Sequence, residues 1–130
     1  MFDLKKPRTY KEICLDDDAL FYRTGLHRYN EFKLPVNVYL FSEVHETDIP
    51  VVEVKLDDLL YYISIEENPK ILTPIPKKYT DIINKVIKFV SLNYKLLFDF
   101  WNNTIDSRRF DHAVYGEDEE YKFFDGEKFI

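Results

Sequence analysis

The period of apolar and polar positions changes along the chain, and this change predicts the order of its elements. In the first part, apolar and polar side chains alternate over short runs, which is typical of β-strands. We expect strands at residues 9–15, 19–23, 34–42, 51–56, 59–66 and 70–72. Residues 26–33 are polar and mixed, which predicts a loop. Short strands joined by polar turns indicate an antiparallel meander, because parallel strands need longer crossovers.

A helical period replaces the alternation after Pro76. Apolar side chains recur at spacings of three, four and seven between residues 77 and 103, while most lysines fall on the opposite side. Proline is tolerated at a helix start and none occurs later in the chain, so we expect one long helix here. Ser91, Leu92 and Asn93 are weak helix formers as a group, and a kink or break is expected there if anywhere.

Strands followed by a helix predict an α+β fold: an antiparallel meander of about four or five strands, covered on one face by the long helix. We place a single domain at residues 1–104 and an acidic, aromatic C-terminal extension at residues 105–130. Asp125-Gly126 lies between alternating aromatic and charged residues, which predicts a terminal hairpin over residues 121–130.

Composition narrows the class of protein. The chain has 130 residues, of which 45% are hydrophobic and 17% aromatic, and a disordered chain would lack so many large rings. A single cysteine, Cys14, permits no internal disulfide, and the charged N-terminus is unlike a signal peptide, so we expect a cytoplasmic protein without a membrane segment. The net charge of −6 disfavours nucleic acid as a partner.

The triplet Glu53-Val54-Lys55 is the first candidate site. One class of metal-dependent nucleases carries a Mg²⁺-binding carboxylate and a catalytic lysine at this spacing on a buried strand. Asp17, another aspartate of residues 16–18, or Asp48 would supply the second carboxylate. The simpler interpretation, which we favour, places Glu53 and Lys55 on the solvent-exposed face of a half-buried strand.

The second candidate is a metal or proton site formed by His45 and Asp48, which lie three residues apart in an expected loop. No two histidines have ligand spacing, and there is no second cysteine. An ordinary polar turn, with the aspartate bonding its own backbone, is the favoured alternative. We therefore expect no bound cofactor.

The C-terminal extension is the third candidate, because it combines negative charge with large rings. Aromatic residues are enriched at protein interfaces, and the acidic run favours a basic partner. The residues that we assign to binding are Glu117, Asp118, Glu119, Glu120, Tyr121, Phe123, Phe124 and Phe129.

Between residues 34 and 103 the order of features is similar to domain-of-unknown-function family 4160, a family of small bacterial proteins. The matching features are Phe41-Ser42, His45, Pro50, Asn93, Leu96-Leu97 and Trp101. The second and third histidines of the family fall at Val51 and Glu53 in this chain. The resemblance implies a small α+β accessory module of the kind encoded beside toxin–antitoxin partners.

Three functions follow in order of preference. The first is a non-enzymatic module of bacterial or phage origin that binds or inhibits a protein, in the manner of an antitoxin. The second is the metal-dependent nuclease or toxin that uses Glu53 and Lys55. The third is a nucleic-acid binder that uses the helix lysines. A homodimer through a sheet edge or the C-terminal hairpin is compatible with each of them.

Overall fold

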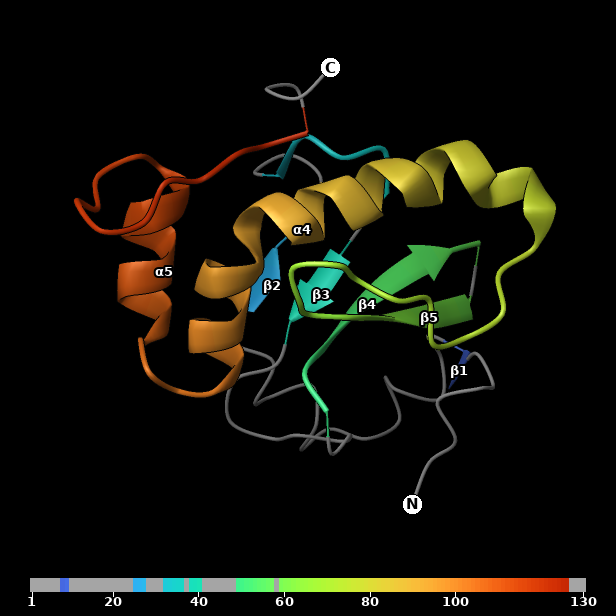
Figure 1. The fold of residues 1–130 in the computed structure, drawn as a ribbon, viewed down its shortest axis with the longest axis horizontal. Coiled ribbons are helices and arrows are strands. Elements are labelled where there is room, and N and C mark those ends of the chain that lie inside the picture. Colours follow the sequence, from blue (N-terminus) through green and yellow to red (C-terminus); the bar gives the residue numbers. More distant parts are fainter. Residues whose placement is uncertain are drawn as a thin grey trace.

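The computed structural model describes residues 8–9, 25–27, 32–36, 38–40, 49–57 and 59–126. These residues form an antiparallel sheet and two α-helices, which confirms the α+β class (Figure 1). No helix within the described ranges is long and apolar enough to cross a membrane.

The sheet contains β1 (Arg8–Thr9), β2 (Gly25–His27), β3 (Val38–Leu40), β4 (Val51–Leu56) and β5 (Leu59–Ser64). Its strand order is β1-β5-β4-β3-β2, and every neighbouring pair is antiparallel. The strands β2 to β5 therefore form a meander, and β1 adds to the free edge of β5. The longest pairing joins β4 to β5 through a tight turn at Asp57, whose φ of 56° lies in the left-handed region.

Two strand predictions need correction. Residues 34–36 are not part of a strand, and β3 begins only at Val38. Pro35 offers no N–H to a neighbouring strand, and Lys33, two residues earlier, has a φ of 58°, so the chain bends here. Residues 25–27 pair with β3 although a loop was expected, because backbone pairing supplied by a neighbour overrides a polar composition. The strand expected at residues 19–23 lies outside the described residues.

The strand predicted at residues 51–56 is confirmed, and the next one ends at Ser64 rather than at residue 66. Ile71, in the short strand expected at residues 70–72, makes an isolated bridge to Ile63 of β5. The Leu72 N–H also donates to the Tyr62 carbonyl at 2.9 Å. Residues 70–72 therefore return along β5 before the helix begins.

The long helix is confirmed. A 3₁₀ turn at Lys77–Tyr79 leads into α4 (Thr80–Trp101), which lies across the strands in Figure 1. Its buried face shares one hydrophobic core with β4, to which Val86 and Val90 of α4 and Val52 and Val54 of β4 all belong. The expected break at residues 91–93 does not occur, and α4 is uninterrupted.

Side-chain hydrogen bonds explain why weak helix formers are found in the middle of α4. The Ser91 hydroxyl donates to the Glu67 carbonyl at 2.6 Å on one side of the helix. The Asn93 amide nitrogen donates to the carbonyls of Phe89 at 2.9 Å and Phe124 at 2.8 Å, and its oxygen accepts the Phe124 N–H at 2.9 Å. These residues attach α4 to two other segments of the chain.

A second helix, α5 (Ser107–Val114), forms where the apolar pattern fades and no helix was predicted. The Asp106 carboxylate caps it by accepting the Arg109 N–H at 2.9 Å. Phe110 and Ala113 are buried, and the ring of Phe110 lies 4.6 Å from that of Phe100 on α4. The core thus continues past residue 104, and the division of the chain at that residue stays a prediction.

Residues 121–126, which we call the strap, return from α5 along α4 to the segment 32–36 (Figure 1). The Gly126 N–H donates to the Phe32 carbonyl at 2.6 Å. The strap forms no strand, so the hairpin prediction is wrong for residues 121–126. The remaining residues of that prediction, 127–130, lie outside the described residues. The Asp-Gly pair favours a turn locally, but contacts with distant parts of the chain determine the conformation of the strap.

We predict that Asn93→Ala lowers the free energy of unfolding by about 2–3 kcal/mol, since it leaves the partly buried N–H and carbonyl of Phe124 without their partner. Urea denaturation of the two proteins measures this loss. Asn84→Ala, at an exposed position of the same helix, is the matched control and should change stability by no more than about 0.5 kcal/mol. Equal effects of the two substitutions would contradict the role assigned to Asn93.

Candidate functional site

The face of the sheet opposite the shared core carries a buried carboxylate. Along β4, Val52, Val54 and Leu56 face the core with α4, so Glu53 and Lys55 belong to the other face. Glu53 has no exposed surface and Lys55 is half-buried. The expectation that both form a solvent-exposed strand face is therefore wrong for Glu53.

Two tyrosines flank this carboxylate in the sheet. Glu53 pairs with Tyr39 of β3 on one side and with Tyr62 of β5 on the other, and both tyrosines are buried. Tyr61, the neighbour of Tyr62 in β5, is buried on the opposite face. Burying a carboxylate is unfavourable unless polar neighbours stabilise it, so Glu53 is an unusual residue for a buried strand position.

The second carboxylate of the nuclease hypothesis is not located. Asp17, His45 and Asp48 lie outside the described residues. In the described part of the chain, no three histidine, cysteine, aspartate or glutamate side chains come together as a metal site. Both metal hypotheses therefore stay predictions.

A different arrangement of charged groups lies at the end of the molecule that contains α5. The helix ends in a Schellman motif: the Glu117 N–H donates to the His112 carbonyl at 2.8 Å, and the Gly116 N–H donates to Ala113 at 3.0 Å. Gly116 has a φ of 79°, the left-handed conformation that this motif requires. This turn leads directly into residues 117–120, which we call the acidic segment.

Arg109 fixes the acidic segment against α5. Its Nε donates to the Asp118 carboxylate at 3.0 Å, and its Nη2 lies 3.1 Å from a carboxylate oxygen of Glu120. The other Asp118 oxygen accepts the N–H groups of Glu120 at 2.8 Å and Tyr121 at 3.2 Å. Arg109 and then these N–H groups hold the pKa of Asp118 below its usual value, so this carboxylate stays charged at neutral pH.

Tyr121 connects the strap to α4 and α5 together. Its hydroxyl donates to the Asp99 carboxylate, and the Arg109 guanidinium lies 5.2 Å from the centre of its ring. Burial, followed by the hydrogen bond to Asp99, raises the pKa of Tyr121 to about 12. The folded protein therefore retains the phenol proton more strongly than an exposed tyrosine does.

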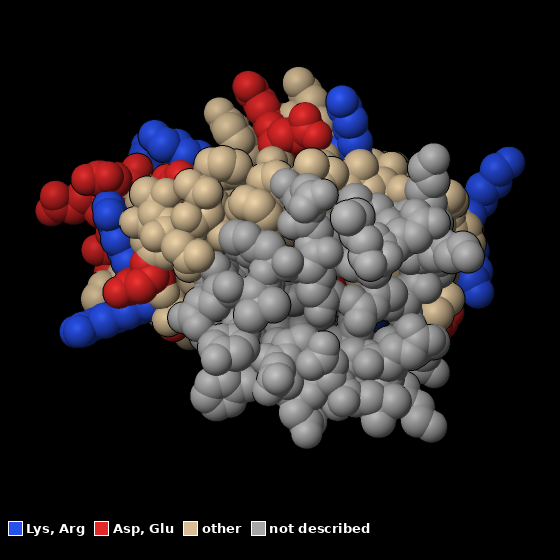
Figure 2. Space-filling model, turned by 90° about the horizontal axis from the view of Figure 1, so that it is seen from below, with Lys and Arg blue, Asp and Glu red and all other residues tan. Residues whose placement is uncertain are grey.

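The predicted binding residues differ in their exposure. Glu117, Glu119 and Glu120 are exposed, and Figure 2 shows acidic side chains at the end of the molecule where Figure 1 places α5. Phe123 instead belongs to the hydrophobic core, and its ring cannot also serve as an exposed contact.

Four further binding residues are half-buried or lie outside the described residues. Asp118, Tyr121 and Phe124 are half-buried, and Phe129 lies outside the described residues. Tyr115 was not predicted as a binding residue, yet 67% of its surface is exposed. Its position two residues before the acidic run at residues 117–120 was the signal in the sequence that could have identified it.

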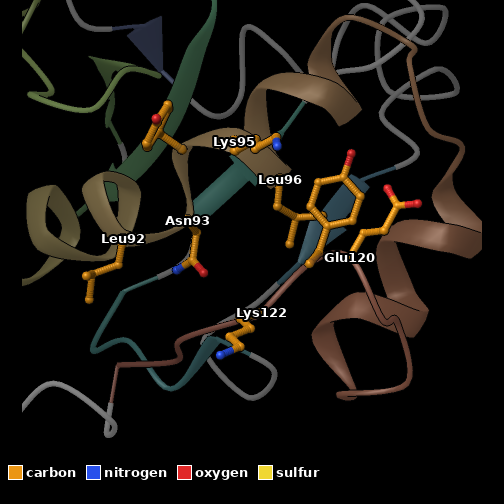
Figure 3. A pocket seen from close by; sticks show the side chains of 8 residues that line it. Leu92, Asn93, Lys95, Leu96, Glu120 and Lys122 are labelled. Atoms are coloured by element: carbon orange, nitrogen blue, oxygen red, sulfur yellow. The ribbon is translucent and has the colours of Figure 1, made fainter.

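A cleft of about 100 Å³ separates α4 from the start of the strap (Figure 3). Leu92, Lys95 and Leu96 line it from the helix, and Glu120 and Lys122 line it from the other side. A space of this size suits a few water molecules or the tip of one side chain, not a metabolite. The end of the molecule at α5 therefore offers a partner a charged surface with one exposed aromatic ring.

No protein-family model matches the chain, and no match was found among curated proteins or among solved structures. The resemblance to domain-of-unknown-function family 4160 thus stays a hypothesis. The nucleic-acid hypothesis also stays open, since the helix lysines on which it relies are exposed: Lys77, Lys78, Lys85, Lys88 and Lys95.

We predict that the raised pKa of Tyr121 makes part of the stability depend on alkaline pH. The stabilisation is complete below the ordinary tyrosine pKa of 10.0 and is lost as the pH rises through about 12. Native protein should therefore exceed Tyr121→Phe in stability by more at pH 8 than at pH 11, as measured by urea unfolding. Tyr115→Phe, at an exposed ring, should show the same difference from native protein at both pH values. A pH-independent gap for Tyr121→Phe would refute this assignment.

Proposed function

We propose that the chain is a protein-binding module that presents the acidic segment and Tyr115 to a basic surface of its partner. The observation that carries this proposal is the combination of exposed carboxylates with a fixed backbone. Arg109 and the end of α5 hold residues 117–120 in one conformation, so little conformational entropy remains to be lost on binding. A disordered acidic tail would lose that entropy when it binds.

The four carboxylates of the acidic segment differ in whether they form ion pairs with other described residues. Asp118 and Glu120 pair with Arg109. Glu117 and Glu119 are exposed, and their side chains make no ion pair with any other described residue. These two carboxylates remain available to lysine or arginine side chains of a partner. Such complementarity mainly increases the association rate and the specificity.

Tyr115 adds a ring to this surface. Tyrosine is enriched at interfaces because it contributes apolar area and a hydroxyl from the same side chain. Its neighbours, Gly116 and the acidic segment, leave the ring open to solvent on α5's C-terminal end. In its finer form the proposal is an inhibitory accessory module of bacterial or phage origin, comparable to an antitoxin.

We predict that the double substitution Glu117→Gln and Glu119→Gln abolishes partner capture and leaves the fold intact, because neither carboxylate supports the structure. The test is a pull-down from the native host, with captured proteins identified by mass spectrometry and then purified for direct binding measurements. The captured partner should be basic, and its affinity for native protein should fall with rising salt.

The matched control for this test is the pair Glu67→Gln and Asp81→Asn, which removes two exposed carboxylates far from α5 along the chain. This control should bind as native protein does. Capture that survives the double substitution at Glu117 and Glu119, or that the control loses equally, would show that the surface is not the binding site.

The metal-dependent nuclease remains as a second candidate because of one observation, the complete burial of Glu53 beside Lys55 on one sheet face. Strongly buried ionisable groups are common at functional sites. This candidate also requires a carboxylate from the residues that are not described. It does not use the acidic segment, so the two proposals are tested independently.

We predict, for this second candidate, that Mn²⁺ raises the thermal unfolding midpoint of native protein and not that of Glu53→Gln, since the metal would bind only the ionised carboxylate. Differential scanning fluorimetry measures the shift. Glu67→Gln, at an exposed position, should keep the full response. Intact DNA and RNA after incubation with the protein and Mn²⁺, together with no shift, would eliminate the nuclease.

A further inference from the structure

The cleft between α4 and the strap adjoins the surface that we assign to partner binding. Glu120 belongs to the acidic segment and also lines the cleft (Figure 3). The opposite wall is α4, which contributes Leu92 and the almost fully buried Leu96. The cleft has a volume of about 100 Å³, enough for the tip of one side chain. A protein bound to the acidic segment therefore lies next to this cleft and can insert one side chain into it.

Several polar groups that line the cleft are already used within the protein. The amide nitrogen of Asn93 donates to two backbone carbonyls, at 2.9 and 2.8 Å. The hydroxyl of Tyr121 donates to the Asp99 carboxylate. A carboxylate oxygen of Glu120 lies 3.1 Å from Nη2 of Arg109, which balances its charge. The donors of Asn93 and Tyr121 and the charge of Glu120 are therefore not what a ligand would meet.

Two lysines of the cleft remain available to a ligand. Figure 3 shows Lys95 on α4 and Lys122 on the strap, so the two ammonium groups come from separate elements. Both side chains are exposed, and neither forms an ion pair with another residue of the described ranges. An ammonium group donates hydrogen bonds and accepts none, so the complementary ligand is an anion with acceptor oxygens. The leucine walls reduce the contact of such a pair with water, which strengthens its attraction.

We propose that the cleft receives the carboxylate of one aspartate or glutamate side chain from the protein that binds the acidic segment. This inference rests on the proposed function, because it assigns the carboxylate to the same partner. The methylene groups of the inserted side chain pack on the two leucines, and its carboxylate meets the two lysines. The partner thus presents basic side chains to the acidic segment and an acidic one to the cleft. Charges of opposite sign at adjacent positions fix its orientation.

The first test measures carboxylate binding directly with a peptide probe. Acetyl-Gly-Glu-Gly-amide is titrated into isotopically labelled full-length protein, and the backbone chemical shifts are followed by NMR. Saturable shifts should concentrate at the residues that line the cleft, among them Leu92, Lys95 and Lys122. Acetyl-Gly-Gln-Gly-amide, which has nearly the same shape without the charge, should give no saturable shift. Equal responses to the two peptides, or no response to either, would overturn the proposal.

Matched variants separate the cleft from a general effect of charge. Lys95→Gln together with Lys122→Gln should weaken binding of the glutamyl peptide about tenfold, since both counter-charges are lost. Lys77→Gln together with Lys85→Gln removes the same charge from exposed positions that do not line the cleft. This control should keep the affinity within about twofold of native protein. An equal loss in the two double variants would show that net charge alone attracts the peptide, and the cleft would not be the site.

Two further measurements identify the source of the carboxylate. Inorganic phosphate is titrated in the same way, and tighter binding of phosphate than of the peptide at the cleft would assign the site to a free anion instead. The purified partner should bind the variant of Lys95 and Lys122 more weakly than its matched control, and equal affinities would overturn the proposal.

The failure of this inference is distinguishable from that of the proposed function. Glu117→Gln with Glu119→Gln should abolish partner capture and leave binding of the glutamyl peptide unchanged, because neither residue lines the cleft. If capture depends on these two glutamates but native protein does not bind the peptide, only the cleft assignment is wrong. If the peptide binds but capture survives the double substitution, the proposed function is wrong, and with it the assignment of the carboxylate to a partner held by the acidic segment.

Discussion

The pair of hydrogen bonds between the Asn93 side chain and the backbone of Phe124 is the interaction on which the arrangement of the C-terminal part depends. Asn93 is buried on α4, and its amide satisfies a strap that pairs with no strand of the sheet. Because buried backbone groups need partners, the strap can lie along the helix only where such an amide exists. Phe123 then enters the core between Phe32 and Phe89.

The same turn of α4 shows why helix propensity wrongly predicts a break at residues 91–93. Serine and asparagine disfavour helix interiors because their side chains compete for backbone hydrogen bonds. Here Ser91 bonds to the Glu67 carbonyl and Asn93 to Phe124, so the competing bonds go to other segments and the helix continues. Their presence in α4 therefore reflects tertiary contacts, which helix propensity does not include.

The surfaces left for function follow from this packing. α4 shares a hydrophobic core with one face of the sheet, and Glu53 is buried on the other face, so neither of these described regions is an open platform. The end of the molecule at α5 is where exposed charge and an exposed ring, Tyr115, come together on a fixed backbone. The aromatic residues expected to serve there divide by depth: Phe123 stabilises the fold, and Tyr121 connects α4, α5 and the strap.

The sequence alone determined the elements whose signal is local: the α+β class, the strand at residues 51–56 and the long helix, because periodicity of two or 3.6 is visible along the chain. It also located the acidic run at residues 117–120, of which Glu117, Glu119 and Glu120 are exposed in the structure. Only the tertiary structure decided that α5 forms, that Glu53 is buried and that residues 121–126 are a strap rather than a hairpin. Each of these depends on partners distant in sequence, such as Phe100, Tyr62 and Asn93, which no local pattern reveals.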